Sequence, residues 1–147
     1  MSFYQSDEEV FLLVRAFEER TLPKTEWTHA AHLTVGLYYC LHAPFGVAKN
    51  LIRDGIYWLN DAHGTPNTES SGYHETLTVF WMRAVDEFSR SVHGSPMHGK
   101  ANRLIEKFDK DYPLRFYSRV FLFSDDARRR YVEPDLDGDR PGTIDQK

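Results

Sequence analysis

Three things are scarce in this sequence: cysteine, excess positive charge and long apolar runs. Cys40 is the single cysteine, so no internal disulfide can form. Lys and Arg total 18 against 22 Asp and Glu, a net charge of -4, which argues against a sequence-independent nucleic-acid binder. The first residues lack the basic and apolar regions of a signal peptide. We therefore expect a cytoplasmic protein with no nucleic-acid or membrane partner.

One stretch of the chain contains no charged side chain at all. Residues 27–48 include no Asp, Glu, Lys or Arg, although three His, a Pro and several hydroxyls interrupt the stretch. Its purest apolar part is too short to span a membrane. A helix formed here has no charged face to offer to solvent, so we expect it to be buried as the central element of the fold.

Apolar residues recur every three or four positions in several segments, which is the period of an amphipathic helix. Ser6 and Glu9 have the spacing of a capping box at the start of the first segment. The predicted helices cover residues 6–21, a segment from Thr25 or Thr28 to Pro44, residues 47–59, residues 73–92 and residues 95–113. Residues 116–123 are expected to form either a short helix or an extended segment, and Ser124 to cap a final helical turn or two. The pattern predicts an all-α bundle of about five helices.

Residues 60–72 contain turn-forming residues and no apolar periodicity, so they are predicted to form the longest internal loop. Loops of this length inside a compact domain are often functional. Because this loop leads directly into His74, we expect it to form a lid or a wall beside the cluster of His29, His32 and His74. Residues 1–132 are expected to form one helical domain, and residues 133–147 a polar, irregular tail.

Three histidines lie near the starts of two predicted helices. His29 and His32 are three positions apart, so they share a helix face and can converge on one ion. His74 begins the apolar stripe of its own helix and should point inward. Three inward imidazoles that leave one coordination position open are typical of a catalytic metal centre. The pattern therefore indicates a metal site at His29, His32 and His74.

The chemistry expected of such a centre is metal-assisted attack by water. Zinc is the first choice of ion, with nickel or iron second, because imidazole suits all three. The metal would acidify its bound water for attack on a carbonyl or phosphoryl group. Glu75 and Glu26 are the candidate catalytic residues, each as a general base or as the partner of a histidine. This interpretation predicts a hydrolase or transferase that acts on a small polar molecule.

Two other interpretations stay open, because histidines near helix starts often only pack and hydrogen-bond. The chain could be a metal-free binding module, in which the histidines and aromatics such as Trp27, Tyr73 and Trp81 form a pocket for a small organic ligand. It could also be an interaction protein whose helices complete their burial in a homodimer. The remaining histidines are interpreted as solvated side chains: His42, His63, His93 and His98.

Certain strings resemble those of a known family. They are W-T-H-A-A-H-L at residues 27–33, G-Y-H-E-T at residues 72–76 and V-E-P-D-L at residues 132–136. Together they resemble a family of small uncharacterised helical bacterial proteins. The resemblance covers most of the chain and implies no activity. The architecture also resembles the metal-binding bundles of the DinB type, in which three histidines on different helices hold a divalent ion. Those bundles pair their last two histidines as H-x-x-x-H, whereas here the pair is H-x-x-H and comes first.

Overall fold

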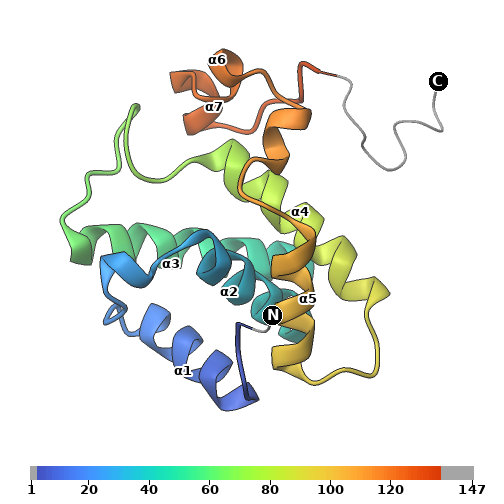
Figure 1. The fold of residues 1–147 in the computed structure, drawn as a ribbon. Coiled ribbons are helices and arrows are strands. Elements are labelled where there is room, and N and C mark those ends of the chain that lie inside the picture. The colour runs from blue at the N-terminus through green and yellow to red at the C-terminus, as the bar shows by residue number, and fades with distance from the viewer. Residues whose placement is uncertain (1–2, 137–147) are drawn as a thin grey trace.

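The computed structural model describes residues 3–136, which form helices and connecting loops with no strand among them (Figure 1). The α-helices are α1 (Asp7–Glu18), α2 (His29–His42), α3 (Phe45–His63), α4 (Glu75–Ser91), α5 (Met97–Lys107), α6 (Arg119–Leu122) and α7 (Asp125–Arg129). Two short 3-10 turns are η1 (Lys24–Glu26) and η2 (Tyr112–Arg115). The prediction of an all-α bundle with about five substantial helices is confirmed.

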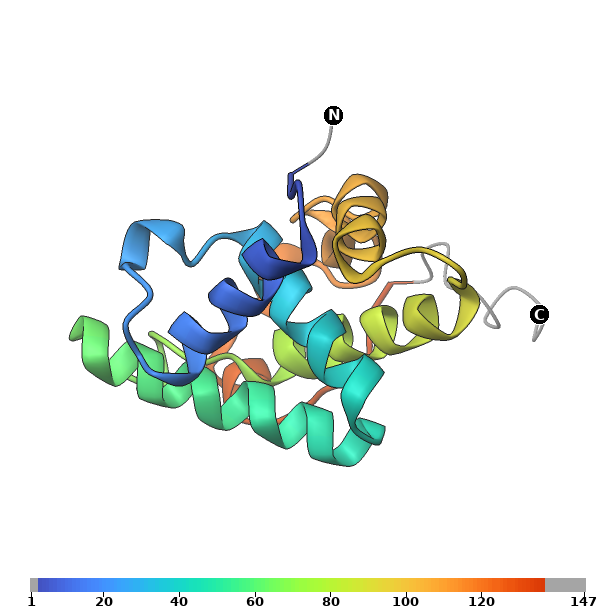
Figure 2. The same cartoon turned by 90° about the horizontal axis from the view of Figure 1, so that it is seen from below.

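Helix α2 is the central element, as its lack of charge predicted. It contacts α1, α3, α4 and α5, and Figure 2 shows it enclosed between them. Five consecutive residues of α2, 33–37, are buried, which covers every direction around the helix axis. None of the helices in residues 3–136 has the length and hydropathy needed to cross a membrane.

The helix boundaries follow local capping chemistry. Thr28 begins α2, because its Oγ1 accepts a hydrogen bond from the backbone N–H of Ala31 at 3.2 Å. The third helix runs to His63, four residues beyond the predicted end, because Gly64 with φ +74° terminates it. The fifth helix ends at Lys107, not at Pro113, because the backbone of the buried Phe108 is extended.

A second, smaller core lies at one end of the molecule, where α7 packs against α4 and α6 packs against α7 (Figure 1). Its buried residues are Phe116, Tyr117, Leu122, Ala127 and Val132. The start of the predicted tail is tied to this core. The Asp135 carboxylate accepts a hydrogen bond from the backbone N–H of Ser118 at 2.8 Å, and the N–H of Leu136 donates to the carbonyl of Phe116 at 2.9 Å. Residues 137–147, the rest of the predicted tail, lie outside the described residues.

A close approach between α1 and α3 helps to fix the positions of Phe17 and Trp27. A Cβ atom placed on Gly55 would lie 2.3 Å from two carbon atoms of the Phe17 ring. The Phe17 ring is 1% exposed and stacks on Trp27, with 4.9 Å between the ring centroids. Because Gly55 has no side chain, the Phe17 ring can lie directly against α3. The position of Phe17 in turn fixes that of Trp27, which stacks on it.

We predict that Gly55→Ala lowers the free energy of unfolding by about 1 to 3 kcal/mol, because the added methyl group overpacks the Phe17 contact. Gly46→Ala in the first turn of the same helix is the matched control, since a Cβ there meets nothing within 4 Å. That control should be neutral or stabilising by up to about 1 kcal/mol. Urea unfolding measures both, and equal stability of the two variants would contradict the packing described.

Candidate functional site

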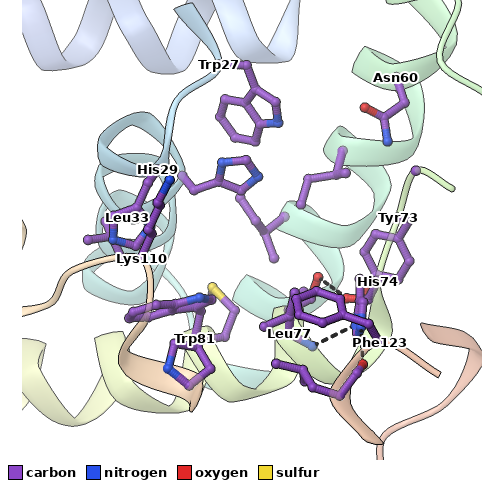
Figure 3. A pocket seen from close by; sticks show the side chains of 18 of the residues that line it. Trp27, His29, Leu33, Asn60, Tyr73, His74, Leu77, Trp81, Lys110 and Phe123 are labelled. Carbon is purple, nitrogen blue, oxygen red and sulfur yellow. Dashed lines mark hydrogen bonds between the residues drawn. The ribbon is translucent and has the colours of Figure 1, made fainter. Parts of the chain in front are cut away.

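A pocket of about 670 Å³ lies among α2, α3, α4 and the segment that leads into α6. Its wall is mainly apolar and aromatic, and Figure 3 shows Trp27, Tyr73 and Trp81 arranged around the same space. The loop after α3 contributes Thr65 and Gly72 to the lining, so it forms part of the wall, as its position in the sequence predicted. Its function as a lid stays a prediction.

His29 and His32 both line this pocket, and each uses one ring nitrogen on a backbone carbonyl. Nε2 of His29 lies 3.0 Å from the carbonyl oxygen of Phe108, and Nδ1 of His32 lies 3.0 Å from that of Thr28. Because a carbonyl oxygen only accepts, each of these nitrogens carries the proton. Nδ1 of His29 and Nε2 of His32 keep their lone pairs, with no hydrogen-bond partner in residues 3–136.

The surroundings of His32 keep its ring neutral. The ring is half-buried, and its centroid lies 3.8 Å from that of Trp27. Burial is the main reason that the pKa of His32 is lowered to about 4, and the nearby His29 acts in the same direction. The hydrogen bond to Thr28 acts against the shift. At neutral pH His32 is therefore a hydrogen-bond acceptor at Nε2 and carries no charge.

His74 lies on the opposite side of the pocket, where both of its ring nitrogens are engaged. It caps α4, since Nδ1 accepts from the backbone N–H of Leu77 at 3.1 Å, while Nε2 donates to the carbonyl of Leu122 at 2.8 Å (Figure 3). Burial lowers the pKa of His74; the positive charge of Arg128 adds to the lowering, and the Leu122 hydrogen bond opposes it. In this arrangement the ring has no lone pair left for a ligand or a metal ion.

The three predicted metal ligands thus border one pocket without forming a ligand set. Of these three histidines, His29 and His32 have a free ring nitrogen and His74 has none. Across residues 3–136, no group of three or more His, Cys, Asp or Glu side chains is arranged to hold a metal ion. The zinc, nickel or iron centre stays a prediction.

The two predicted catalytic carboxylates lie outside the lining of this pocket. The Glu75 carboxylate accepts a hydrogen bond from the hydroxyl of Tyr73 at 2.7 Å, and it lies 4.0 Å from the ammonium group of Lys49. Glu26 is exposed at the end of η1 and borders a smaller hollow beside α1. Their catalytic roles also stay predictions.

His63 is a pocket residue that the sequence pattern does not reveal. The pattern predicts a solvated side chain, but His63 is half-buried, lines the pocket and donates from Nε2 to the carbonyl of Leu22 at 2.7 Å. The sequence does contain an indication of this position. Gly64 is typical of the residue just after a helix, so it places His63 in the last turn of α3. The prediction of a solvated His98 is also wrong, since its Nδ1 lies 2.6 Å from the carboxylate of Asp7.

Two further polar side chains near the end of α3 belong to the pocket wall. Asn60 is 9% exposed, and its Nδ2 donates to Oδ1 of Asn67 at 3.0 Å. Thr65 Oγ1 is buried and has no hydrogen-bond partner within the described part of the chain. An unpaired buried hydroxyl costs about 1 to 3 kcal/mol unless water or a ligand reaches it. Neither residue stands out in the sequence, because both lie among ordinary turn formers.

The pKa of His32 predicts a dependence of stability on pH. In the unfolded chain this histidine takes up a proton near pH 6.5, whereas in the folded chain it does so only near pH 4. Its contribution to the free energy of unfolding is therefore complete above pH 6.5 and is lost as the pH falls toward 4. As the pH is lowered across this range, the free energy of unfolding measured with urea should fall less steeply for His32→Gln than for the unmodified protein. The exposed His93→Gln serves as the control for removal of one histidine, and identical profiles for His32→Gln and the unmodified protein would contradict the prediction.

The two hydrogen bonds of His74 predict a structural role that can be measured without any metal. In the presence of chelator, His74→Ala should lower the free energy of unfolding by about 1 to 3 kcal/mol, because it removes the cap of α4 and leaves the Leu122 carbonyl unpaired. His74→Asn can still cap the helix and should recover part of the loss. Unchanged stability of His74→Ala in chelator would mean that these hydrogen bonds contribute nothing to the fold.

Comparison with protein-family models, curated proteins and solved structures found no match for this chain. The resemblances to small helical bacterial proteins and to DinB-type bundles therefore stay predictions. What the pocket can do has to be argued from its own residues.

Proposed function

We propose that this chain is a small-molecule-binding protein whose pocket takes an organic ligand without a metal ion. The observation that carries the proposal is the state of His29 and His32. Each ring gives its one N–H group to a backbone carbonyl and keeps a lone pair at the wall of an apolar cavity. These nitrogens are suited to accept hydrogen bonds from hydroxyl or N–H groups of a ligand.

The size and composition of the pocket support this proposal. Its volume of about 670 Å³ lies within the range of roughly 300 to 1,000 Å³ that is usual for small-molecule sites. Such sites are mostly apolar, with a few polar groups that fix the orientation of the ligand. Here Leu33, Leu77 and Trp81 supply apolar wall, and the two imidazoles supply the polar groups.

The metal-dependent hydrolase is less well supported by the same geometry. It needs a third ligand, and the ring of His74 has both nitrogens in hydrogen bonds. His63 keeps Nδ1 free, but no three His, Cys, Asp or Glu side chains of residues 3–136 are arranged to hold a metal ion. It also needs a general base, and neither Glu26 nor Glu75 lines the pocket. A backbone carbonyl that holds an imidazole N–H is, however, an arrangement that also orients metal ligands. Divalent ions are therefore tested beside the organic probes.

We expect 2-naphthol to bind the chelator-treated protein and to shift backbone amide NMR signals of Leu33 and Leu77 at the pocket wall. It should bind about three to ten times more tightly than 2-methoxynaphthalene, which cannot donate a hydrogen bond. His32→Phe, which keeps an aromatic ring of similar shape but removes the acceptor, should reduce this preference. The exposed His93→Phe is the matched control and should preserve it.

Zinc, nickel and ferrous iron are titrated into the same protein after removal of chelator. The proposal predicts no stoichiometric binding and no rise in melting temperature at ion concentrations that saturate known metal centres. Failure of 2-naphthol to bind, together with stoichiometric binding of one of these ions, would replace the proposal with the metal-centre hypothesis.

A further inference from the structure

The charged side chains around the pocket differ in sign from the chain as a whole. The protein carries a net charge of -4. The pocket lining, in contrast, includes the three cations Lys24, Lys110 and Arg119 and a single carboxylate, Asp111. All four side chains are exposed, whereas the histidines among the lining are buried or half-buried. The pocket therefore combines an apolar interior with positively charged residues on its solvent-facing side.

These cations are not used by the fold. Within residues 3–136, the side chains of Lys24, Lys110 and Arg119 make no ion pair and no hydrogen bond. Against the one lining carboxylate, Asp111, these three cations leave an excess of positive charge at the pocket, which favours anions.

The interior of the pocket is suited to a ring. Trp27, Trp81 and Phe123 contribute aromatic surface, and Figure 3 shows them on different sides of the pocket. The indole N–H groups of both tryptophans have no hydrogen-bond partner in the described part of the chain. A planar ring can therefore make both apolar contacts and edge-on hydrogen bonds there.

We infer that the ligand of this pocket is an aromatic anion: its ring lies among the tryptophans and histidines, and its carboxylate or phosphate group faces the exposed cations of the lining, which include Lys110 and Arg119. A donor group on the ring pairs with the lone pair of His32. This inference rests on the proposed function and adds the chemical class of the ligand. A neutral ring would use the interior alone, whereas an anion also uses the cations that the fold leaves unpaired.

The test compares four probes on the full chain by titration calorimetry in chelator: 6-hydroxy-2-naphthoate, 2-naphthyl phosphate, 2-naphthol and 2-naphthylmethylamine. At least one anion should bind about five times more tightly than 2-naphthol, and the cationic amine should bind more weakly than 2-naphthol. The advantage of the anion should shrink as salt is added, because exposed charges are screened, while the affinity for 2-naphthol stays nearly constant.

Variants that remove a positive charge test which residues strengthen the binding of the anion. Lys110→Gln combined with Arg119→Gln should remove most of the advantage of the anion over 2-naphthol. Arg103→Gln on α5, an exposed cation that does not line the pocket, is the matched control and should preserve the advantage.

The outcomes separate this inference from the proposed function. If 2-naphthol binds and neither anion binds more tightly, the pocket is a small-molecule site but the assignment of an aromatic anion is overturned. That assignment is also overturned if Arg103→Gln weakens anion binding as much as the Lys110 and Arg119 double variant does. If no probe binds, including 2-naphthol, the proposed function itself fails.

Discussion

Helix α2 has no charged side chain to present to water, and α1, α3, α4 and α5 cover it. Each fully buried Leu or Val side chain contributes roughly 1.5 to 3 kcal/mol, and α2 supplies several, so the arrangement of these four helices follows from the need to enclose it. The uncharged segment begins at Trp27, and its first helical turn therefore brings His29 and His32 into the molecule. The pocket forms where this end of α2 meets α3 and α4.

Backbone carbonyl groups then determine what the histidines can do. The carbonyls of Thr28, Phe108 and Leu22 each fix the proton on one nitrogen of a pocket histidine and leave the other nitrogen free. The carbonyl of Leu122 does the same for His74, but the helix cap takes the second nitrogen. The ring of His74 therefore differs from the rings proposed to bind a ligand by one additional hydrogen bond.

Much of the fold was predictable, because the helical period and the caps are local in the sequence. Thr28 and the charge-free segment indicated the central helix, and the i, i+3 spacing placed His29 and His32 at one site. The bonds of His74 to Leu122 and of His29 to Phe108 join residues 48 and 79 positions apart, and no periodic pattern encodes such contacts. The pocket cations Lys110 and Arg119 were missed for the same reason, since they enter the pocket through tertiary packing.

The central claim is that each pocket histidine donates one ring N–H group to a backbone carbonyl. His29, His32 and His63 keep the other ring nitrogen free, whereas His74 uses both nitrogens in hydrogen bonds. Nitrogen-15 NMR of the histidine rings at neutral pH, before and after addition of zinc, tests it most directly because it reports which nitrogen of each ring carries the proton. We predict a proton on Nδ1 of His32 and on Nε2 of His29, His63 and His74, with the signals of His74 unchanged by zinc. Stoichiometric zinc-induced shifts of His29, His32 and His74 together would contradict it.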